Sequence, residues 1–324
     1  MRGTRQPIAP RQSPKVNTLP TCTLGYLENQ CEAFIRLTVG TDSANLICEP
    51  HMKISVVIPA HNEEGCLEAT VRAIVSALQQ EQIPHEILIV NDNSTDGTGE
   101  VCARLEREFE TVRQIINQPP NGFGFAVRVG LREFRGDAVA IVMADGSDDT
   151  KDLVAGYRKL QDGYDCVFGS RFMRGSQVVD YPGHKLVINR LANWFIKTIF
   201  NIRYNDVTNA FKLYRREVIA GVQPILSHHF NLTVELPLKA IARGYSYSVI
   251  PIRWYNRKAG ISKLRINEMG SRYLFIVLYV WLEKHLSRGD YLRGNHIPEA
   301  IVRPITGNKA GENGIGAHGE IEHS

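Results

Sequence analysis

The stretch ISVVIPA, Ile54 to Ala60, decides the fold, because seven small or apolar residues follow one another without a charged residue. Such a run is typical of a strand that is buried on both faces of a sheet. A segment with helical spacing follows at residues 66–80, and the alternation continues to residue 171. Further strand patterns lie at residues 85–92, 112–118, 137–145 and 165–171. The alternation predicts an α/β fold with a doubly wound sheet, whose ligands bind beyond the carboxyl ends of the strands.

The rhythm of the sequence changes after residue 171. Amphipathic helical patterns cover residues 184–200, 231–244 and 266–286, and a strand pattern covers residues 247–257. Both ends of the chain lack such periodicity. We therefore predict that residues 1–51 form a disordered extension and residues 294–324 a disordered tail. Met52 resembles a natural protein start, and a misassigned start codon would make residues 1–51 functionless.

Composition excludes several classes of protein. The 324 residues are 43% hydrophobic and 22% charged, as in an ordinary globular protein, and the net charge of +4 does not indicate a nucleic-acid partner. Six scattered cysteines without a CxxC pair form neither a zinc ribbon nor a readable disulfide framework. No apolar run reaches the roughly 18 residues that span a bilayer, and no signal peptide is visible. We expect a cytoplasmic protein, which can still lie on a membrane surface.

Polar residues follow the first two predicted strands, where a sheet of this kind binds its ligands. Pro59 is expected to stop the ladder of the first strand before Asn62 and Glu63, and Asp92 ends the second strand. A carboxylate at these places can accept hydrogen bonds from a ribose or a base. The structural alternative is that the acids favour a helix N-terminus and that NDNSTDGT forms an Asx turn.

Gly122 and Gly124, in NGFGFAVRVG, precede a predicted helix. Glycine lets the backbone approach a ligand closely, and a helix N-terminus favours anions. The two glycines alone are a weak signal, because the segment does not match the P-loop pattern.

The stretch IVMADGSDD, Ile141 to Asp149, ends a predicted strand in three carboxylates. A magnesium ion usually takes one or two carboxylates together with substrate phosphates, and Asp145 is well placed for that role. Asp148 and Asp149 are candidates for a second ligand or for the cap of the helix that begins near Thr150. We favour the cap for one of them.

The order of these motifs, followed by FGSR, DVTNAFKLYRRE and GISKL, resembles glycosyltransferase family 2 over about residues 52–270. The most similar group within it is that of the dolichol-phosphate mannosyltransferases and other polyprenyl-phosphate glycosyltransferases. The resemblance implies a GT-A fold with a nucleotide-sugar half at residues 52–170 and an acceptor half, facing a membrane, at residues 171–293. It also implies inverting sugar transfer with Mg²⁺ or Mn²⁺.

Matching the family motifs to this chain gives a set of expected site residues. Pro59, Asn62, Glu63 and Asp92 would hold the nucleoside, beside Gly122 and Gly124. Asp145 would bind the metal. The residues expected to face phosphates or to close over the substrates are Arg171, Lys212, Ser262 and Lys263.

The chain departs from the family pattern at the metal motif. Met143 stands where the family usually has the first aspartate of D-x-D, and Ser147 replaces a frequent glutamine. Either Asp148 replaces the missing ligand or metal binding is weaker or absent.

The expected acceptor decides the mechanism. The oxygen of a lipid phosphate is already anionic, so orientation and charge neutralisation suffice without a general base. Residues 171–216 hold nine Lys or Arg and two acids, which agrees with an anionic acceptor. An acceptor hydroxyl would instead require a base, and Glu235 is the candidate.

We expect mannose transfer from GDP-mannose to a polyprenyl phosphate, by an enzyme that lies peripherally on the inner face of the membrane. The helical segments at 184–200 and 266–286 would contact lipid, or would instead be core or dimer helices. A membrane-anchor subunit or a homodimer is a further expectation. The alternatives are a UDP-sugar donor such as UDP-glucose, a glycan hydroxyl acceptor, and a degenerate nucleotide-sugar binding protein without catalysis.

Overall fold

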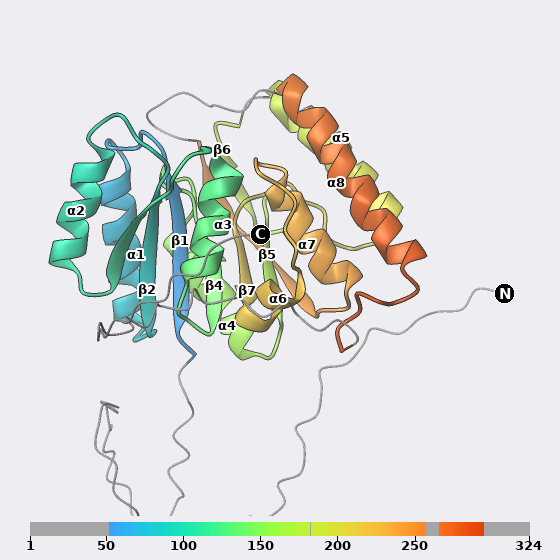
Figure 1. Cartoon of the computed structure of the whole chain (residues 1–324), viewed down its shortest axis with the longest axis horizontal. Helices are drawn as coiled ribbons and strands as arrows, with labels where there is room; N and C mark the ends of the chain where they lie inside the picture. The colour runs from blue at the N-terminus through green and yellow to red at the C-terminus, as the bar shows by residue number, and fades with distance from the viewer. Residues whose placement is uncertain (1–51, 182, 257–265, 295–324) are drawn as a thin grey trace, which may run out of the picture. The chain divides into compact units, whose positions relative to one another are not determined.

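The computed structural model describes residues 52–181, 183–256 and 266–294. Their centre is a seven-stranded sheet in the order β3-β2-β1-β4-β7-β5-β8 (Figure 1). Its strands are β1 (Ile54–Ala60), β2 (His85–Asn91), β3 (Val112–Ile116), β4 (Ala138–Ile141), β5 (Cys166–Ser170), β7 (Lys212–Arg215) and β8 (Tyr247–Pro251). Helices cover both faces, which confirms the predicted α/β class.

Strands β1 to β4 lie next to one another and run parallel, as β5 and β8 do. All seven residues of β1 are buried, as the unbroken apolar run predicts, with β2 on one side and β4 on the other. The strand does not stop at Pro59, contrary to the expectation. Pro59 pairs in register with Val90, and the ladder continues to Ala60.

Strand β7 enters the sheet in the opposite direction. It is antiparallel to both β4 and β5, and its first residue, Lys212, lies opposite Ile141 at the end of β4. The start of β7 therefore lies at the same sheet edge as the carboxyl ends of β4 and β5. A small second sheet pairs β6 (Gln177–Val179) with β9 (Arg253–Tyr255) near this edge.

Helices follow the strands as the sequence predicts. Four of them accompany the parallel part of the sheet: α1 (Leu67–Gln80), α2 (Thr98–Glu108), α3 (Phe123–Glu133) and α4 (Thr150–Gln161). The others are α5 (Gly183–Phe200), α6 (Arg216–Gly221), α7 (Leu232–Ala242) and α8 (Ile266–Leu286). Helices α5 and α8 contact each other, and α8 also packs on α7.

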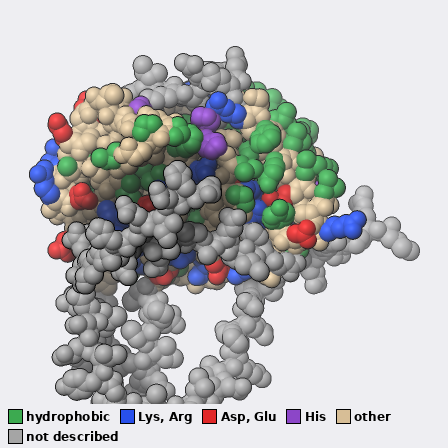
Figure 2. All heavy atoms as spheres, in the orientation of Figure 1, with side chains coloured by type: hydrophobic (Ala, Val, Ile, Leu, Met, Phe, Trp, Pro, Cys, Tyr) green, Lys and Arg blue, Asp and Glu red, His purple; other side chains and the backbone are tan. Residues whose placement is uncertain are grey.

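Helices α5 and α8 expose a wide apolar surface, which we call the α5/α8 face. Figure 2 shows hydrophobic side chains gathered over these helices. The face consists of large hydrophobic side chains that are 38–69% exposed, namely Val187, Ile188, Leu191, Trp194, Phe195, Leu274, Phe275, Leu278, Leu282 and Leu286. No helix in the described part of the chain is both long and apolar enough to cross a bilayer.

Candidate active site

Asp92 connects three loops at the carboxyl edge of the sheet. Its Oδ1 accepts a hydrogen bond from Asn117 Nδ2 at 2.7 Å, and its Oδ2 accepts one from the Gly122 N–H at 2.8 Å. Its carbonyl oxygen lies 2.6 Å from His61 Nδ1. The side chain is buried, at 4% exposure. Asp92 thus fixes the shape of the expected nucleoside site from within.

The loop after β1 is bonded to the loop after β2. The exposed Asn62 adopts a positive φ of 55°, and its Oδ1 accepts a hydrogen bond from the Thr95 N–H at 2.8 Å. The Glu63 N–H donates to Thr98 Oγ1 at 2.9 Å. The structure therefore brings Asn62, Glu63 and Asp92 to one edge, as predicted. Pro59 lies inside β1.

The two glycines before α3 have different roles. Gly122 has a φ of +144° and donates its N–H to Asp92, so it shapes the loop. A Cβ at Gly124 would lie 2.3 Å from the carbonyl carbon of His228. Gly124 is therefore required by the close packing of the 228–229 loop, and the expected approach of its backbone to a ligand is not what the glycine provides. Phe123 stacks on Phe230 at the same contact.

The three aspartates after β4 each accept a hydrogen bond from a different backbone N–H group. Asp149 Oδ1 accepts a hydrogen bond from the Lys151 N–H at 2.8 Å, so Asp149 is the N-cap of α4. Asp148 Oδ2 accepts one from the Met143 N–H at 3.0 Å, and Asp145 Oδ1 accepts one from the Ser147 N–H at 3.1 Å. Burial raises the pKa of Asp148 to about 7, and the charge of Asp145 adds to this rise.

The charge balance of Asp145 and Asp148 suits a cation. The charge of Asp145 raises the pKa of Asp148, so the two carboxylates repel each other when both are ionised, and a divalent ion would relieve that repulsion. Within residues 52–181, 183–256 and 266–294, no group of three or more His, Cys, Asp or Glu side chains is arranged to hold a metal. The pair therefore fits an ion that takes one or two protein carboxylates and completes its shell with substrate phosphates.

Arg171, directly after β5, is held by a residue that the sequence analysis gave no role. Its Nε and Nη2 donate to the two carboxylate oxygens of Asp206, and its backbone N–H donates to Asp206 Oδ2 at 2.8 Å. Asp206 is fully buried and Arg171 is 9% exposed. No local pattern indicates this pair, because the two residues are 35 positions apart in the sequence.

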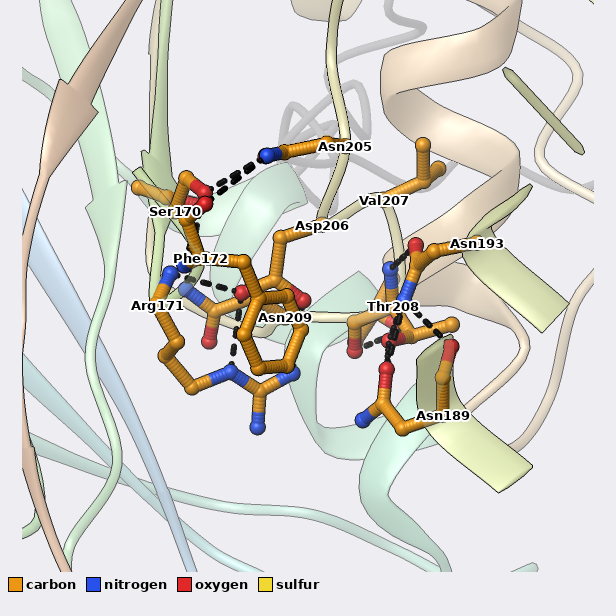
Figure 3. A network of polar contacts seen from close by, with 12 residues as sticks. Ser170, Arg171, Phe172, Asn189, Asn193, Asn205, Asp206, Val207, Thr208 and Asn209 are labelled. Atoms are coloured by element: carbon orange, nitrogen blue, oxygen red, sulfur yellow. Dashed lines mark hydrogen bonds and ion pairs between the residues drawn. The ribbon is translucent and has the colours of Figure 1, made fainter. Parts of the chain in front are cut away.

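The loop that carries Asp206 also binds α5 (Figure 3). Thr208 Oγ1 donates to Asn189 Oδ1 at 2.9 Å and accepts a hydrogen bond from Asn193 Nδ2 at 3.1 Å. Ser170 Oγ, at the end of β5, donates to Asn205 Oδ1 at 2.6 Å. The loop at residues 205–209 therefore links the position of Arg171 to the helix that forms half of the α5/α8 face.

Lys212 lies below the same loop, 1% exposed. Its Nζ donates to the carbonyl oxygens of Val207 and Asn209. Burial lowers the pKa of Lys212 to about 7, against the opposing influence of Asp206. The expectation that Lys212 faces phosphates at the open edge is wrong for this arrangement, because its ammonium group is committed to two backbone carbonyls.

Glu235 is not available as a general base. It is fully buried, and its Oε1 and Oε2 accept hydrogen bonds from the Leu226 and Ser227 N–H groups, each at 2.7 Å. Its Oε1 also lies 2.7 Å from Lys239 Nζ. A carboxylate with these partners stabilises the loop before α7 and cannot reach an acceptor hydroxyl. The sequence alone gave no sign of its burial.

The expected closing loop, with Ser262 and Lys263, lies outside the described residues. Its role in binding substrates stays a prediction. Asp145 and Asp148 follow β4 and Arg171 follows β5, two strands that flank β7 and end at the same edge of the sheet.

Comparison with known proteins identifies the family of the chain. Residues 55–222 match the family model described as "Glycosyl transferase family 2". The chain belongs to glycosyltransferase family 2. The catalytic class follows from the family, so the chain is a glycosyltransferase, which confirms the resemblance seen in its motifs.

Two curated members of the family are each 30% identical to this chain. One is a polyprenol monophosphomannose synthase from Mycolicibacterium smegmatis, matched over 69% of this chain and 85% of the relative. The other is a dolichol-phosphate mannosyltransferase from Pyrococcus furiosus, matched over 66% of this chain. The match spans 60% of that relative's length.

The fold is also found among solved glycosyltransferases. The glucosyl-3-phosphoglycerate synthase of Mycobacterium tuberculosis, solved with Mn²⁺, UDP and glucosyl-3-phosphoglycerate, superposes with a TM-score of 0.54 at 17% identity. The match covers 72% of this chain and 80% of that structure. The likeness confirms the GT-A-like fold.

Proposed function

We propose that this glycosyltransferase moves mannose from GDP-mannose to a polyprenyl phosphate at the cytoplasmic face of a membrane. The observation that carries the proposal is the α5/α8 face, which is joined through Asn189, Asn193 and Thr208 to the loop that holds Arg171. An apolar surface of this extent, beside the candidate site, suits an enzyme whose acceptor is a membrane lipid. The names of the two curated relatives support the same acceptor class.

The charges around the apolar surface support a bilayer as its partner. Helix α5 contains Lys185, Arg190 and Lys197 and no acidic residue. On α8, Glu283 is paired with the buried Arg243, and the exposed Lys284 donates from its Nζ to the Phe200 carbonyl oxygen at 3.0 Å. A basic rim around an apolar face favours an anionic lipid surface over a protein core.

The reaction needs charge neutralisation more than proton transfer. An acceptor phosphate oxygen would attack the sugar carbon, and the bond from that carbon to the leaving GDP would break. Because the attacking oxygen is already anionic, no base is needed, and the burial of Glu235 agrees with that. Arg171, held in place by Asp206, would offset phosphate charge.

A divalent cation would be held by Asp145, with Asp148 beside it. When bound, it would supply positive charge to the leaving diphosphate. Mg²⁺ or Mn²⁺ is the proposed ion, since carboxylate and phosphate oxygens are the ligands that these hard cations take. A membrane-anchor subunit or a homodimer stays a prediction.

The test is transfer of radiolabelled mannose from GDP-mannose into lipid. We expect label that extracts into organic solvent when vesicles contain a polyprenyl phosphate and Mg²⁺ or Mn²⁺. The parallel assay with UDP-glucose tests the other donor. Label that appears only in water-soluble product would contradict a lipid acceptor.

A further inference from the structure

A cavity of about 430 Å³ lies between the loop before α7 and the first turns of α8. This volume is within the range of small-molecule sites. Its polar lining consists of His228, His229, Asn231, Ser271 and Arg272. None of the residues expected to hold the donor or the metal lines this cavity. Its His228 lies in the loop that packs on Gly124, next to the candidate active site.

The electrostatics of the cavity favour an anion. None of the described residues that line it is acidic. Burial, and after it the nearby charge of Arg128, lowers the pKa of His228, which disfavours the charged form of this imidazole. Arg272, half-buried on α8, is therefore the permanent positive charge of the lining. Guanidinium groups bind phosphate oxygens through paired, charge-assisted hydrogen bonds.

The cavity lies between the sugar-donor edge and the apolar surface. On one side, the loop with His228 packs against Gly124, and the neighbouring Gly122 is bonded to Asp92. On the other side, Phe275 lines the cavity and is also 60% exposed on the α5/α8 face. An occupant with a charged head and an apolar tail matches both ends.

We propose that this cavity binds the phosphate head of the polyprenyl-phosphate acceptor, with Arg272 as its main ligand, and that the isoprenoid tail leaves past Phe275 onto the α5/α8 face. The inference rests on the proposed function and adds to it the place where the acceptor binds. It makes Arg272 and Phe275 acceptor-binding residues, separate from Arg171 and Asp145.

The test compares the full-length protein with Arg272→Gln, Arg272→Lys and Phe275→Ser. The control is Arg107→Gln, which removes one exposed positive charge from α2, outside both the cavity and the α5/α8 face. Steady-state rates are measured with farnesyl phosphate, a soluble short-chain acceptor, and with a long polyprenyl phosphate in phosphatidylcholine vesicles. The KM of GDP-mannose and the thermal unfolding midpoint are recorded for each variant.

Arg272→Gln should raise the KM of both acceptors about tenfold or more, because one charge-assisted contact to phosphate is lost. The kcat and the KM of GDP-mannose should change little, and Arg272→Lys should recover part of the loss. Phe275→Ser, at an exposed position where folding is not at risk, should also raise the KM of both acceptors. Arg107→Gln should leave the KM of both acceptors unchanged.

Three results would overturn the inference. An unchanged acceptor KM in Arg272→Gln, with normal turnover of the parent protein, would reject the cavity and leave the proposed function intact. Inorganic phosphate that competes as well as farnesyl phosphate would show a free-phosphate site and reject the path of the tail. No transfer by the parent protein to either acceptor would reject the proposed function itself.

Discussion

The guanidinium of Arg171 faces the carboxylate of Asp206, with Nε–Oδ2 and Nη2–Oδ1 distances of 2.8 and 2.7 Å. The arginine follows β5, and the aspartate lies in the loop before β7. Both side chains are buried, so each charge depends on the other for compensation. The pair fixes the arginine before any substrate binds, which is the preorganisation that electrostatic catalysis requires.

Asp206→Asn should lower the free energy of unfolding by about 3 kcal/mol, because it leaves the buried Arg171 without a counter-charge. Urea denaturation measures the effect. Glu81→Gln, which removes the partner of Arg158 in an exposed ion pair, is the matched control and should cost less than about 1 kcal/mol. Equal losses in the two variants would show that the Arg171–Asp206 pair is no stronger than a surface pair.

Asp145→Ala should reduce sugar transfer by about 100-fold or more, because it removes the main proposed metal ligand. Asp148→Ala should raise the metal concentration at which transfer is half-maximal. Both are measured by titrating Mg²⁺ and Mn²⁺ at saturating donor. A metal dependence that is identical in Asp148→Ala and the parent protein would remove Asp148 from the proposed ligands.

Asp149→Ala should lower the free energy of unfolding by about 1 kcal/mol, the usual cost of losing a helix N-cap. The metal dependence of transfer should stay as in the parent protein, since the carboxylate of Asp149 caps α4. Denaturation and metal titration on the same preparation separate the two roles. A shift in metal dependence would make Asp149 a ligand.

Lys212→Met should change how stability depends on pH. Burial lowers the pKa of Lys212 from the ordinary 10.5 to about 7, with Asp206 and Asp148 opposing the shift and Arg171 adding to it. Between these values the unfolded chain binds more protons than the folded one, so the contribution of Lys212 to stability rises with pH and is lost as pH falls towards 7.

The free energy of unfolding of the parent protein, relative to Lys212→Met, should therefore increase from pH 7 to 10. The slope should approach about 1.4 kcal/mol per pH unit, the value for one proton. Urea denaturation at several pH values gives the two curves. Parallel curves would mean that Lys212 titrates alike in the folded and unfolded chains.

Trp194→Glu should weaken binding to anionic phosphatidylglycerol vesicles by about tenfold or more, because Trp194 is 66% exposed in the middle of the α5/α8 face. Ile116→Glu is the matched control, since Ile116 is 55% exposed on β3 and lies on a different element. Vesicle sedimentation measures binding. Equal loss in both variants, or no loss in either, would contradict a lipid-binding role for this face.

Local patterns in the sequence predict the helices and the parallel strands well. The predicted start of a helix near Thr150 and the predicted helix at residues 266–286 agree with the structure, where α4 begins at Thr150 and α8 spans Ile266–Leu286. The assignment of one of the two aspartates before Thr150 to a cap is confirmed at Asp149. These features depend on neighbouring residues, so a local pattern contains the necessary information.

Features that depend on distant residues were not predictable in the same way. Glu235 and Lys239 are fully buried because α7 packs against α8 and the rest of the fold, which the helical pattern of α7 does not indicate. The pairing of Arg171 with Asp206 and the burial of Lys212 both follow from the insertion of β7 between β4 and β5. Strand order of this kind is set by tertiary packing, which no short segment encodes.

Synthesis of the chain produces β5 well before β7, although β7 joins β5 to the strands made earlier. Before Lys212 has left the ribosome, a nascent chain can pair β1 with β2 and β4. The other edge of β4 is then unpaired, and β5 has neither of its described partners, β7 and β8. Unpaired strand edges are where chaperones bind and aggregation starts. The ordering of Arg171 therefore comes late, and premature termination before β7 yields an aggregation-prone sheet.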